Sequence, residues 1–145
     1  MEIEHACHCT YRIRYHMVFV VKYRKNMLLQ KVPLEFFKNV LTGIGERYWF
    51  KFDAIGVEED HFHIVVGAAP RNSPSNVMGV IKSISAKNIF KNYPEIKKFL
   101  WGGNFWSAGG HIDTVSEFGG LEIIRKYVRE QGRNEEQLKL LSFVV

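Results

Sequence analysis

Cysteine and proline are scarce in this sequence, and long apolar runs are missing. Only two cysteines, Cys7 and Cys9, occur among 145 residues. They are too few and too close together for a disulfide framework. No apolar run reaches the roughly 18 residues that a membrane-spanning helix requires, and the first residues lack the basic and apolar stretches of a secretory signal. These absences predict a cytoplasmic protein that does not enter a membrane.

The composition is that of a packed globular protein. Hydrophobic residues make up 46% of the chain and charged residues 24%, which argues against disorder. The length predicts one domain spanning residues 1–145. The net charge of +5 favours an anionic partner, most commonly nucleic acid, although this charge alone is weak support.

One strand-like stretch carries two histidines, His61 and His63, on either side of Phe62, and β-branched residues follow. Such residues favour a strand, and side chains alternate between its two faces. The two imidazoles therefore share one face, and Phe62 points to the other. Two imidazoles on one face can hold a divalent metal. The same spacing also suits two histidines at the exposed end of a half-buried strand.

Alternating apolar residues predict strands, and apolar residues three or four positions apart predict helices. Pro33 suits a helix start, and the loop 69–75 ends in a helix N-cap signal. The predicted order is strand 11–23, helix 33–48, strand 50–57, a strand beginning at His61, a helix between Ser75 and Pro94, strand 110–115 and helix 121–131, with a short helical turn at 94–100.

The first six of the longer elements follow a β-α-β-β-α-β pattern, and the acidic turn 58–60 joins the second and third strands into a hairpin. This order predicts an α+β fold of the ferredoxin-like or RRM-like type. An antiparallel sheet is covered by helices on one face, and a further helix lies near the C-terminus.

Basic residues gather at several places. On strand 11–23, one face begins with Arg12, Arg14 and His16, which suits either a surface facing phosphates or a solvated face. The cluster 22–25 mixes cations with a tyrosine, which suits a DNA backbone with a stacked base or a charged turn after a strand. Three lysines of the second helix are predicted to point outward: Lys82, Lys87 and Lys91.

Three further segments each allow two interpretations. The loop 101–107 is rich in glycine and aromatics, which can stack on exposed bases or close over a core edge. The stretch 5–9 contains histidine and cysteine, which suits a small metal clip or, more simply, a frayed terminus. His111 and Asp113 share a strand face, where they suit the surface or a contact behind a metal ligand.

Tyr127 and Gln131 are four residues apart on the last predicted long helix, so both project from one face. If that face meets the histidine strand, two imidazoles, an amide oxygen and a phenol come together. A nearby cation would promote ionisation of the phenol. A phenoxide is also a fair leaving group, so a phosphotyrosine link could be resealed without a nucleotide cofactor. Taken singly, the two residues suit packing and a solvated helix end.

The segment His61-Phe62-His63, followed by Lys126-Tyr127-Val128-Arg129-Glu130-Gln131, resembles the single-tyrosine HUH transposases of the insertion-sequence 200/605 family. Three more segments support the resemblance: the run Tyr15-His16-Met17-Val18-Phe19-Val20-Val21-Lys22-Tyr23-Arg24, Asp60, and the pair Thr114-Val115. The similarity spans about residues 11–131.

The resemblance implies a metal-dependent transposase that cleaves and rejoins single-stranded DNA. His61, His63 and Gln131 would hold Mg²⁺ or Mn²⁺, and Tyr127 would be the catalytic nucleophile. The family works as homodimers, recognises hairpins at element ends and leaves a 5′-phosphotyrosine with a free 3′-hydroxyl. The tyrosine helix can serve the partner's metal site. The candidate DNA contacts are Lys22, Arg24, Lys82, Lys87, Arg125 and Arg129.

The sequence also departs from the family pattern. Ser116-Glu117-Phe118-Gly119-Gly120 replaces the usual polar cap of the tyrosine helix, and its glycines suit either a hinge or a poor helix start. Two alternative functions make different predictions. A non-catalytic RRM-like nucleic-acid-binding module would bind without covalent product, but the aromatic strand motif of such modules is missing. A metal phosphohydrolase would need a general base and carboxylate ligands, which the pattern does not supply.

Overall fold

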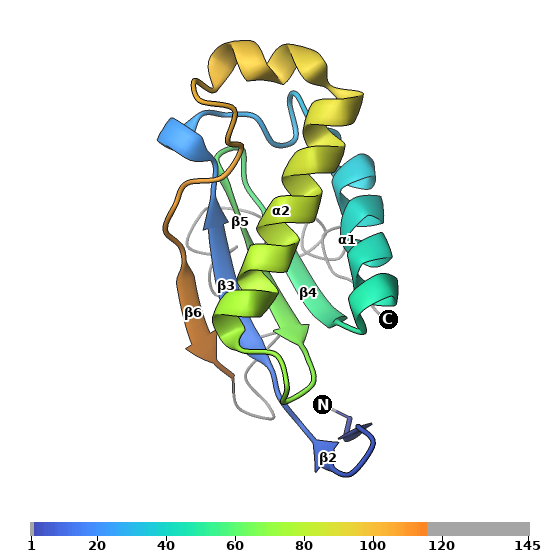
Figure 1. The fold of residues 1–145 in the computed structure, drawn as a ribbon. Helices are drawn as coiled ribbons and strands as arrows, with labels where there is room; N and C mark the ends of the chain where they lie inside the picture. Colours follow the sequence, from blue (N-terminus) through green and yellow to red (C-terminus); the bar gives the residue numbers. More distant parts are fainter. Residues whose placement is uncertain (1, 116–145) are drawn as a thin grey trace.

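The computed structural model describes residues 2–115, and Figure 1 shows their arrangement. The predicted helix 121–131, with Tyr127, Gln131, Arg125 and Arg129, lies outside the described residues. The observed elements are β1 (Glu4–His5), β2 (Thr10–Tyr11), β3 (Tyr15–Val20), the 3-10 turn η1 (Lys22–Arg24), α1 (Leu34–Tyr48), β4 (Lys51–Val57), β5 (His61–Gly67), α2 (Pro74–Asn92), the 3-10 turn η2 (Pro94–Phe99) and β6 (His111–Thr114).

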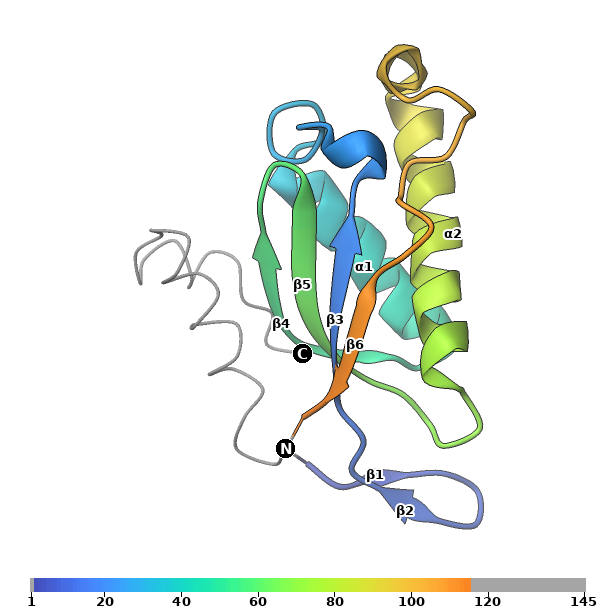
Figure 2. The ribbon, with the colours of Figure 1, turned by 90° about the vertical axis from the view of Figure 1, so that its left-hand side faces the viewer.

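Four strands form one antiparallel sheet in the order β4-β5-β3-β6. Figure 2, turned by a quarter, shows α1 and α2 on the same face of this sheet. The predicted α+β, ferredoxin-like fold is therefore confirmed. The register sets Val20 opposite His61 and Val18 opposite His63, and places His16 opposite Asp113 on the other side of β3.

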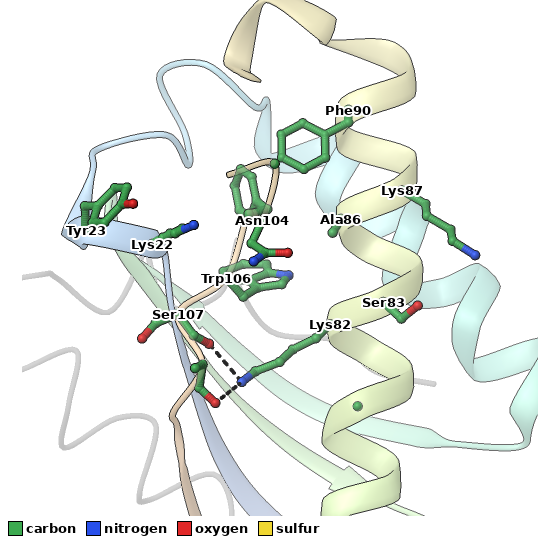
Figure 3. Close-up of a pocket in the computed structure, with 14 residues that line it drawn as sticks. Lys22, Tyr23, Lys82, Ser83, Ala86, Lys87, Phe90, Asn104, Trp106 and Ser107 are labelled. Carbon is green, nitrogen blue, oxygen red and sulfur yellow. Dashed lines mark hydrogen bonds between the residues drawn. The ribbon is translucent and has the colours of Figure 1, made fainter. Parts of the chain in front are cut away.

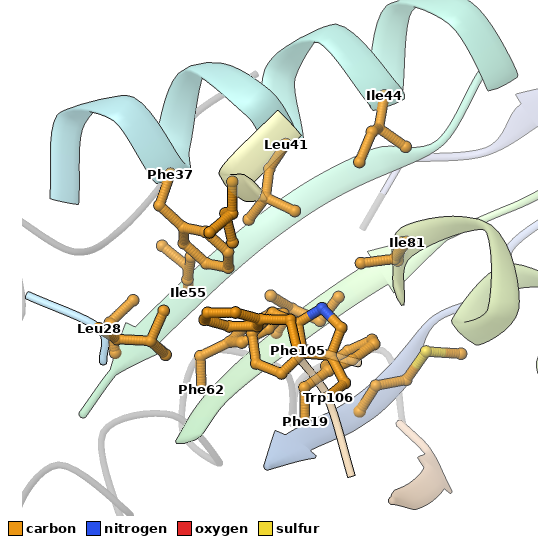
Figure 4. Close-up of a cluster of buried hydrophobic side chains, with 14 of the residues drawn as sticks. Phe19, Leu28, Phe37, Leu41, Ile44, Ile55, Phe62, Ile81, Phe105 and Trp106 are labelled. Carbon is orange, nitrogen blue, oxygen red and sulfur yellow. The ribbon is translucent and has the colours of Figure 1, made fainter. Parts of the chain in front are cut away.

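The hydrophobic core fills the space between the sheet and the two helices. Alternate residues of β3 and β5 point into it, among them Phe19 and Phe62, whose rings stack with centroids 4.4 Å apart. Phe37 of α1 meets Phe62 edge-on at 4.7 Å. Figure 4 shows these rings together with Trp106, which closes one edge of the cluster. The two-residue period thus commits one face of each central strand to the core.

Local sequence signals explain how both helices begin. Pro33 precedes the first residue of α1, as its fixed φ favours. The hydroxyl of Ser73 accepts a hydrogen bond from the Asn76 amide at 3.0 Å and caps α2. On α2, Ser85 is buried because its hydroxyl accepts a 2.9 Å hydrogen bond from the Trp106 indole.

The predicted strand 11–23 is wrong in its extent. β2 ends at Tyr11 and β3 begins at Tyr15, and between them Arg14 is buried with 2% of its surface exposed. Its Nε donates to Asp53 Oδ2 at 2.6 Å, where a β-bulge of β4 sets Asp53. A guanidinium needs such a partner when it leaves water. Arg14 therefore faces neither phosphates nor solvent.

Two other expectations need correction. Lys82 does not point outward, because its Nζ donates to the carbonyl oxygens of Ser107, Ala108 and Gly109 at 3.0, 3.3 and 2.8 Å. The N-terminal stretch is not frayed, since β1 and β2 pair as a small hairpin that exposes Cys7 and Cys9. Among residues 2–115, no helix is both long and apolar enough to span a membrane.

A substitution at Gly67, the last residue of β5, tests how closely the buried Arg14 packs against the strand. A Cβ atom there would lie 2.9 Å from both the Arg14 Cζ atom and the Ile13 carbonyl oxygen. We expect Gly67→Ala to lower the free energy of unfolding by about 2 kcal/mol, since overpacking costs roughly 1–3 kcal/mol. Urea unfolding followed by circular dichroism measures this change.

Gly43 of α1 provides the matched control, because a Cβ there meets nothing within 4 Å. Gly43→Ala should raise stability by roughly 0.5–1 kcal/mol through helix propensity. Equal effects of the two alanines would contradict a close approach at Gly67.

Candidate metal centre

The two histidines of β5 lie on the face of the sheet opposite the helices. Their neighbours Phe62 and Ile64 are fully buried in the core, so the strand's alternation turns His61 and His63 the other way. The two imidazole centroids are 5.0 Å apart, with the ring planes at 83°. His63 is 5% exposed, so this is not the exposed end of a strand.

His61 is oriented by the acidic turn that precedes it. Its Nδ1 lies 2.6 Å from Asp60 Oδ1, and Arg24 Nη1 lies 3.4 Å from the other carboxylate oxygen. Partial burial tends to raise the Asp60 pKa. The hydrogen bond and charge of His61, helped by Arg24, outweigh that effect and hold this pKa below its usual value. The carboxylate is therefore ionised where it orients the imidazole.

His63 is oriented by a second histidine, His16 of β3, which is 1% exposed. His16 Nε2 lies 3.3 Å from His63 Nδ1, and the two ring planes are within 8° of parallel. Behind His16, Asp113 Oδ2 lies 4.0 Å from Nδ1 and 2.6 Å from His111 Nε2. The side chains of His111 and Asp113 are both about half-exposed, and Asp113 also lies behind the pair formed by His16 and His63.

The alternation of the sequence places His16 on a basic strand face and predicts no role for it at the site. The available signal was positional, because an isolated histidine stands between apolar residues at the middle of a strand. Only the strand order brings His16 beside His63, since these two residues are 47 positions apart along the chain and β3 pairs with β5 through the register Val18 to His63.

Both buried imidazoles are held in the neutral form. Burial is the main cause that lowers the pKa of His63 to about 3, and the neighbouring His61 and His16 lower it further. Burial likewise lowers the pKa of His16, against an opposing pull from Asp113. Neutral imidazole is the form that binds metal. In the two histidines of β5, Nδ1 is already engaged, by Asp60 in His61 and by His16 in His63. Nε2 is therefore the nitrogen that would bind a metal.

The residues that the structure describes supply only part of a metal site. Within residues 2–115, no group of three or more His, Cys, Asp and Glu side chains could hold an ion. A pair of imidazoles leaves room for a ligand of another kind, such as an amide oxygen. Gln131, predicted for that role, and Tyr127 lie outside the described residues.

The predicted phosphate contacts are divided between different parts of the molecule. Arg24 approaches the histidine site through Asp60, and Lys22 lies in the same turn. Lys82 and Lys87 belong to α2, which covers the other face of the sheet. These lysines are therefore separated from the histidines by the sheet. Arg125 and Arg129 lie outside the described residues.

The fold and the histidine pair together define a ferredoxin-like domain with a candidate metal centre on the sheet face opposite α1 and α2. The sequence profile of the family described as "Transposase IS200 like" matches residues 9–131. The ISDra2 transposase TnpA of Deinococcus radiodurans is 33% identical over 125 residues, which cover 86% of this chain and 88% of that protein. This chain therefore belongs to the IS200-like transposase family.

Other relatives agree with this assignment. The transposase of insertion sequence element IS200 from Salmonella typhimurium is 25% identical, over 93% of this chain and 87% of its own. A provisionally assigned transposase from Deinococcus radiodurans has a similar structure, with a TM-score of 0.69 and 27% identity over 90% of this chain and 99% of its own. A REP-associated tyrosine transposase bound to a REP hairpin shares the fold, with a TM-score of 0.57 and 12% identity over 86% and 75%.

The lowered pKa of His63 predicts a pH-dependent stability in metal-free protein. The unfolded chain takes up a proton near pH 6.5, whereas the folded chain resists it until about pH 3. Stability is therefore fully present above pH 6.5 and falls as the pH drops toward 3, by up to about 1.4 kcal/mol per pH unit for one group. Urea unfolding in the presence of EDTA at pH 7, 6, 5 and 4.5 measures the slope.

His63→Asn should flatten this slope, because the variant has no group to titrate there. His8→Asn removes an exposed histidine of the N-terminal hairpin and should leave the slope unchanged. The same slope in all three proteins would show that His63 is not held neutral by burial.

Proposed function

We propose that this protein is a metal-dependent transposase that cuts and rejoins single-stranded DNA through Tyr127. The observation that carries the proposal is the histidine pair on β5, in which His63 is buried and held neutral, in a chain of the IS200-like family. Neutral imidazoles on one face of a strand are suitable ligands for a divalent metal. A bound metal would give a transposase the means of activating a phosphodiester.

His61 and His63 would hold the metal together with Gln131, and Mg²⁺ or Mn²⁺ are the ions we propose. The donor set fits, because two imidazoles and an amide are neutral and leave the charge of the ion undiminished. When bound, the ion supplies Lewis-acid polarisation of a phosphate oxygen. Asp60 and His16 would keep the two imidazoles in the orientation that binding requires.

The proposed chemistry exchanges one phosphate ester for another. The Tyr127 oxygen forms a bond to phosphorus as the phenol gives up its proton. The bond from phosphorus to the 3′-oxygen breaks, and that oxygen takes up a proton to leave a free 3′-hydroxyl. The 5′-phosphotyrosine that remains keeps the energy of the broken bond, so the reverse attack reseals DNA without a nucleotide cofactor.

We further propose that the protein acts as a homodimer on DNA ends that form hairpins. The support for a hairpin is the fold shared with a transposase whose structure includes one. Either Tyr127 of the same chain or that of the second copy could serve a given pair of histidines.

Tyr127→Phe tests the nucleophile. The variant keeps the ring but lacks the hydroxyl, so we expect it to bind hairpin DNA normally and to form no covalent product. A denaturing gel of end-labelled single-stranded DNA with Mg²⁺ or Mn²⁺ detects the product. Tyr93→Phe, at the C-cap of α2, removes a phenol elsewhere and should leave the yield unchanged. Covalent product from the Tyr127 variant at the normal yield would end the proposal.

The histidine pair is tested by metal binding alone, without DNA. Isothermal titration with Mn²⁺ should show an affinity loss of tenfold or more in His61→Ala and His63→Ala, and none in His5→Ala, which removes a histidine of the N-terminal hairpin. For His16→Leu we expect a loss of about tenfold, the lower end for a residue behind a ligand.

His16→Gln should recover part of that loss, because the glutamine amide can reach the place of the imidazole Nε2. Unchanged Mn²⁺ affinity in both His61→Ala and His63→Ala would rule out this metal site even if DNA cleavage persisted.

A further inference from the structure

Two large aromatic side chains stand exposed on separate loops that contact each other. Tyr23 in η1 is 60% exposed and Trp101, in the loop after η2, is 85% exposed. The Tyr23 hydroxyl donates to the Trp101 carbonyl oxygen at 3.5 Å, and Lys22 Nζ donates to the same oxygen at 2.6 Å. The fold thus brings together aromatic side chains that are 78 residues apart.

The backbone at Tyr23 is held in an uncommon conformation, and two glycines let the chain turn after Trp101. Tyr23 and Arg24 have φ values of 60° and 51°, the left-handed region that residues other than glycine rarely occupy. On the other loop, Gly102 and Gly103 have φ values of 90° and 74°. Such conformations gather at binding sites, where surrounding contacts maintain them. Here the Lys22 and Tyr23 contacts to Trp101 hold the two loops together.

A pocket of about 810 Å³ lies beside these rings, between the loop 103–108 and α2. Figure 3 shows Lys22 and the Trp106 indole at this pocket and Phe90 nearby, whereas the Lys87 side chain extends away from it on the other side of α2. No aspartate or glutamate occurs among the lining side chains that the structure describes. The combination of cations, aromatic rings and the Asn104 amide is the chemistry that binds a single-stranded nucleic acid.

The aromatic pair is directly connected to the histidine site. The Val21 amide donates to the Asp60 carbonyl oxygen at 2.8 Å. Arg24 Nη1 contacts the Asp60 carboxylate, which in turn orients His61. A strand of DNA leaving the metal centre at this end of the sheet would therefore meet η1 first and Trp101 next.

We propose that Tyr23 and Trp101 form a stacking platform for bases of single-stranded DNA that flank the cleavage site, with Lys22 beside the backbone phosphates. This inference rests on the proposed function, because it concerns the same DNA strand. Duplex DNA does not fit the platform, since its bases are already stacked on one another.

The test is fluorescence anisotropy with labelled oligo-dT of 20 nucleotides and a 20-base-pair duplex, using the full chain in EDTA so that no cleavage occurs. Trp101→Ala and Tyr23→Ala should each weaken oligo-dT binding by about tenfold, the effect typical of losing one stacked base. Duplex binding should change by less than about twofold, because base stacking dominates only for the single strand.

Trp49→Ala is the matched control, since Trp49 is also highly exposed, at 79%, and also has a left-handed backbone, with φ 63°. It caps α1 just before β4, at the end of the sheet away from η1. Oligo-dT should bind this variant as it binds the unaltered protein. Equal weakening by Trp49→Ala and Trp101→Ala would overturn the platform, as would unchanged binding in both platform variants.

Tryptophan fluorescence gives a second measurement that does not depend on affinity. The chain has three tryptophans, and Trp106 is buried. In Trp49→Phe, oligo-dT should quench the emission through Trp101, and the quenching should disappear when Trp101→Phe is added. Persistence of the quenching would contradict stacking on Trp101.

The covalent-attachment assay separates this inference from the proposed function. If the unaltered protein forms its tyrosine link while Trp101→Ala binds oligo-dT normally, only the platform is wrong. If the unaltered protein neither binds oligo-dT nor forms the link, both are wrong.

Discussion

The two-residue period of β5 is the constraint on which the rest of the structure depends. It sends Phe62, Ile64 and Val66 into the core and turns His61 and His63 to the opposite face. Because the core residues are fully buried, the strand cannot slip by one position without exposing three apolar side chains and burying both imidazoles among hydrocarbon. The packing of α1 and α2 therefore determines where the histidines face, although neither helix touches that side.

The histidine site is organised by its neighbours as much as by its two possible ligands. A histidine buried as His63 is would be costly to charge, and its surroundings keep it neutral by desolvation and by the nearness of other imidazoles. His61, by contrast, has the Asp60 carboxylate beside it. The two rings thus differ in environment, and each is held through Nδ1 by a different strand or turn. An ion arriving at the pair would find the rings already oriented, which reduces the ordering that binding must impose.

Much of the fold could be predicted from the sequence because periodicity and caps are local properties. The α1 helix, the β4–β5 hairpin and the order of the elements along the chain all followed from such patterns. The interruption before β3 could not be predicted, because Arg14 is buried through an ion pair with a residue 39 positions away. The sequence likewise does not predict the role of His16, because His63, which it contacts, is 47 positions away. Of the two tryptophans of loop 101–107, Trp106 closes over the core, as one of the two interpretations predicted, and Trp101 stands exposed. Base stacking by this loop stays a prediction. The assignments of Gln131 and Tyr127 stay predictions.

The Lys82 ammonium links the helical side of the sheet to the histidine side indirectly, through the segment that precedes β6. By holding the carbonyl oxygens of Ser107, Ala108 and Gly109, it fastens to α2 the segment that runs directly into β6. β6 carries Asp113, the carboxylate behind His16, so the imidazole face receives part of its order from a cation on the helical face. Partial burial lowers the pKa of Lys82, and its three carbonyl contacts compensate for the water it has lost. A neutral side chain of the same length would not hold these three carbonyl oxygens. The glycine-containing segment before β6 would then be less ordered, and this loss of order would reach the histidines through the sheet.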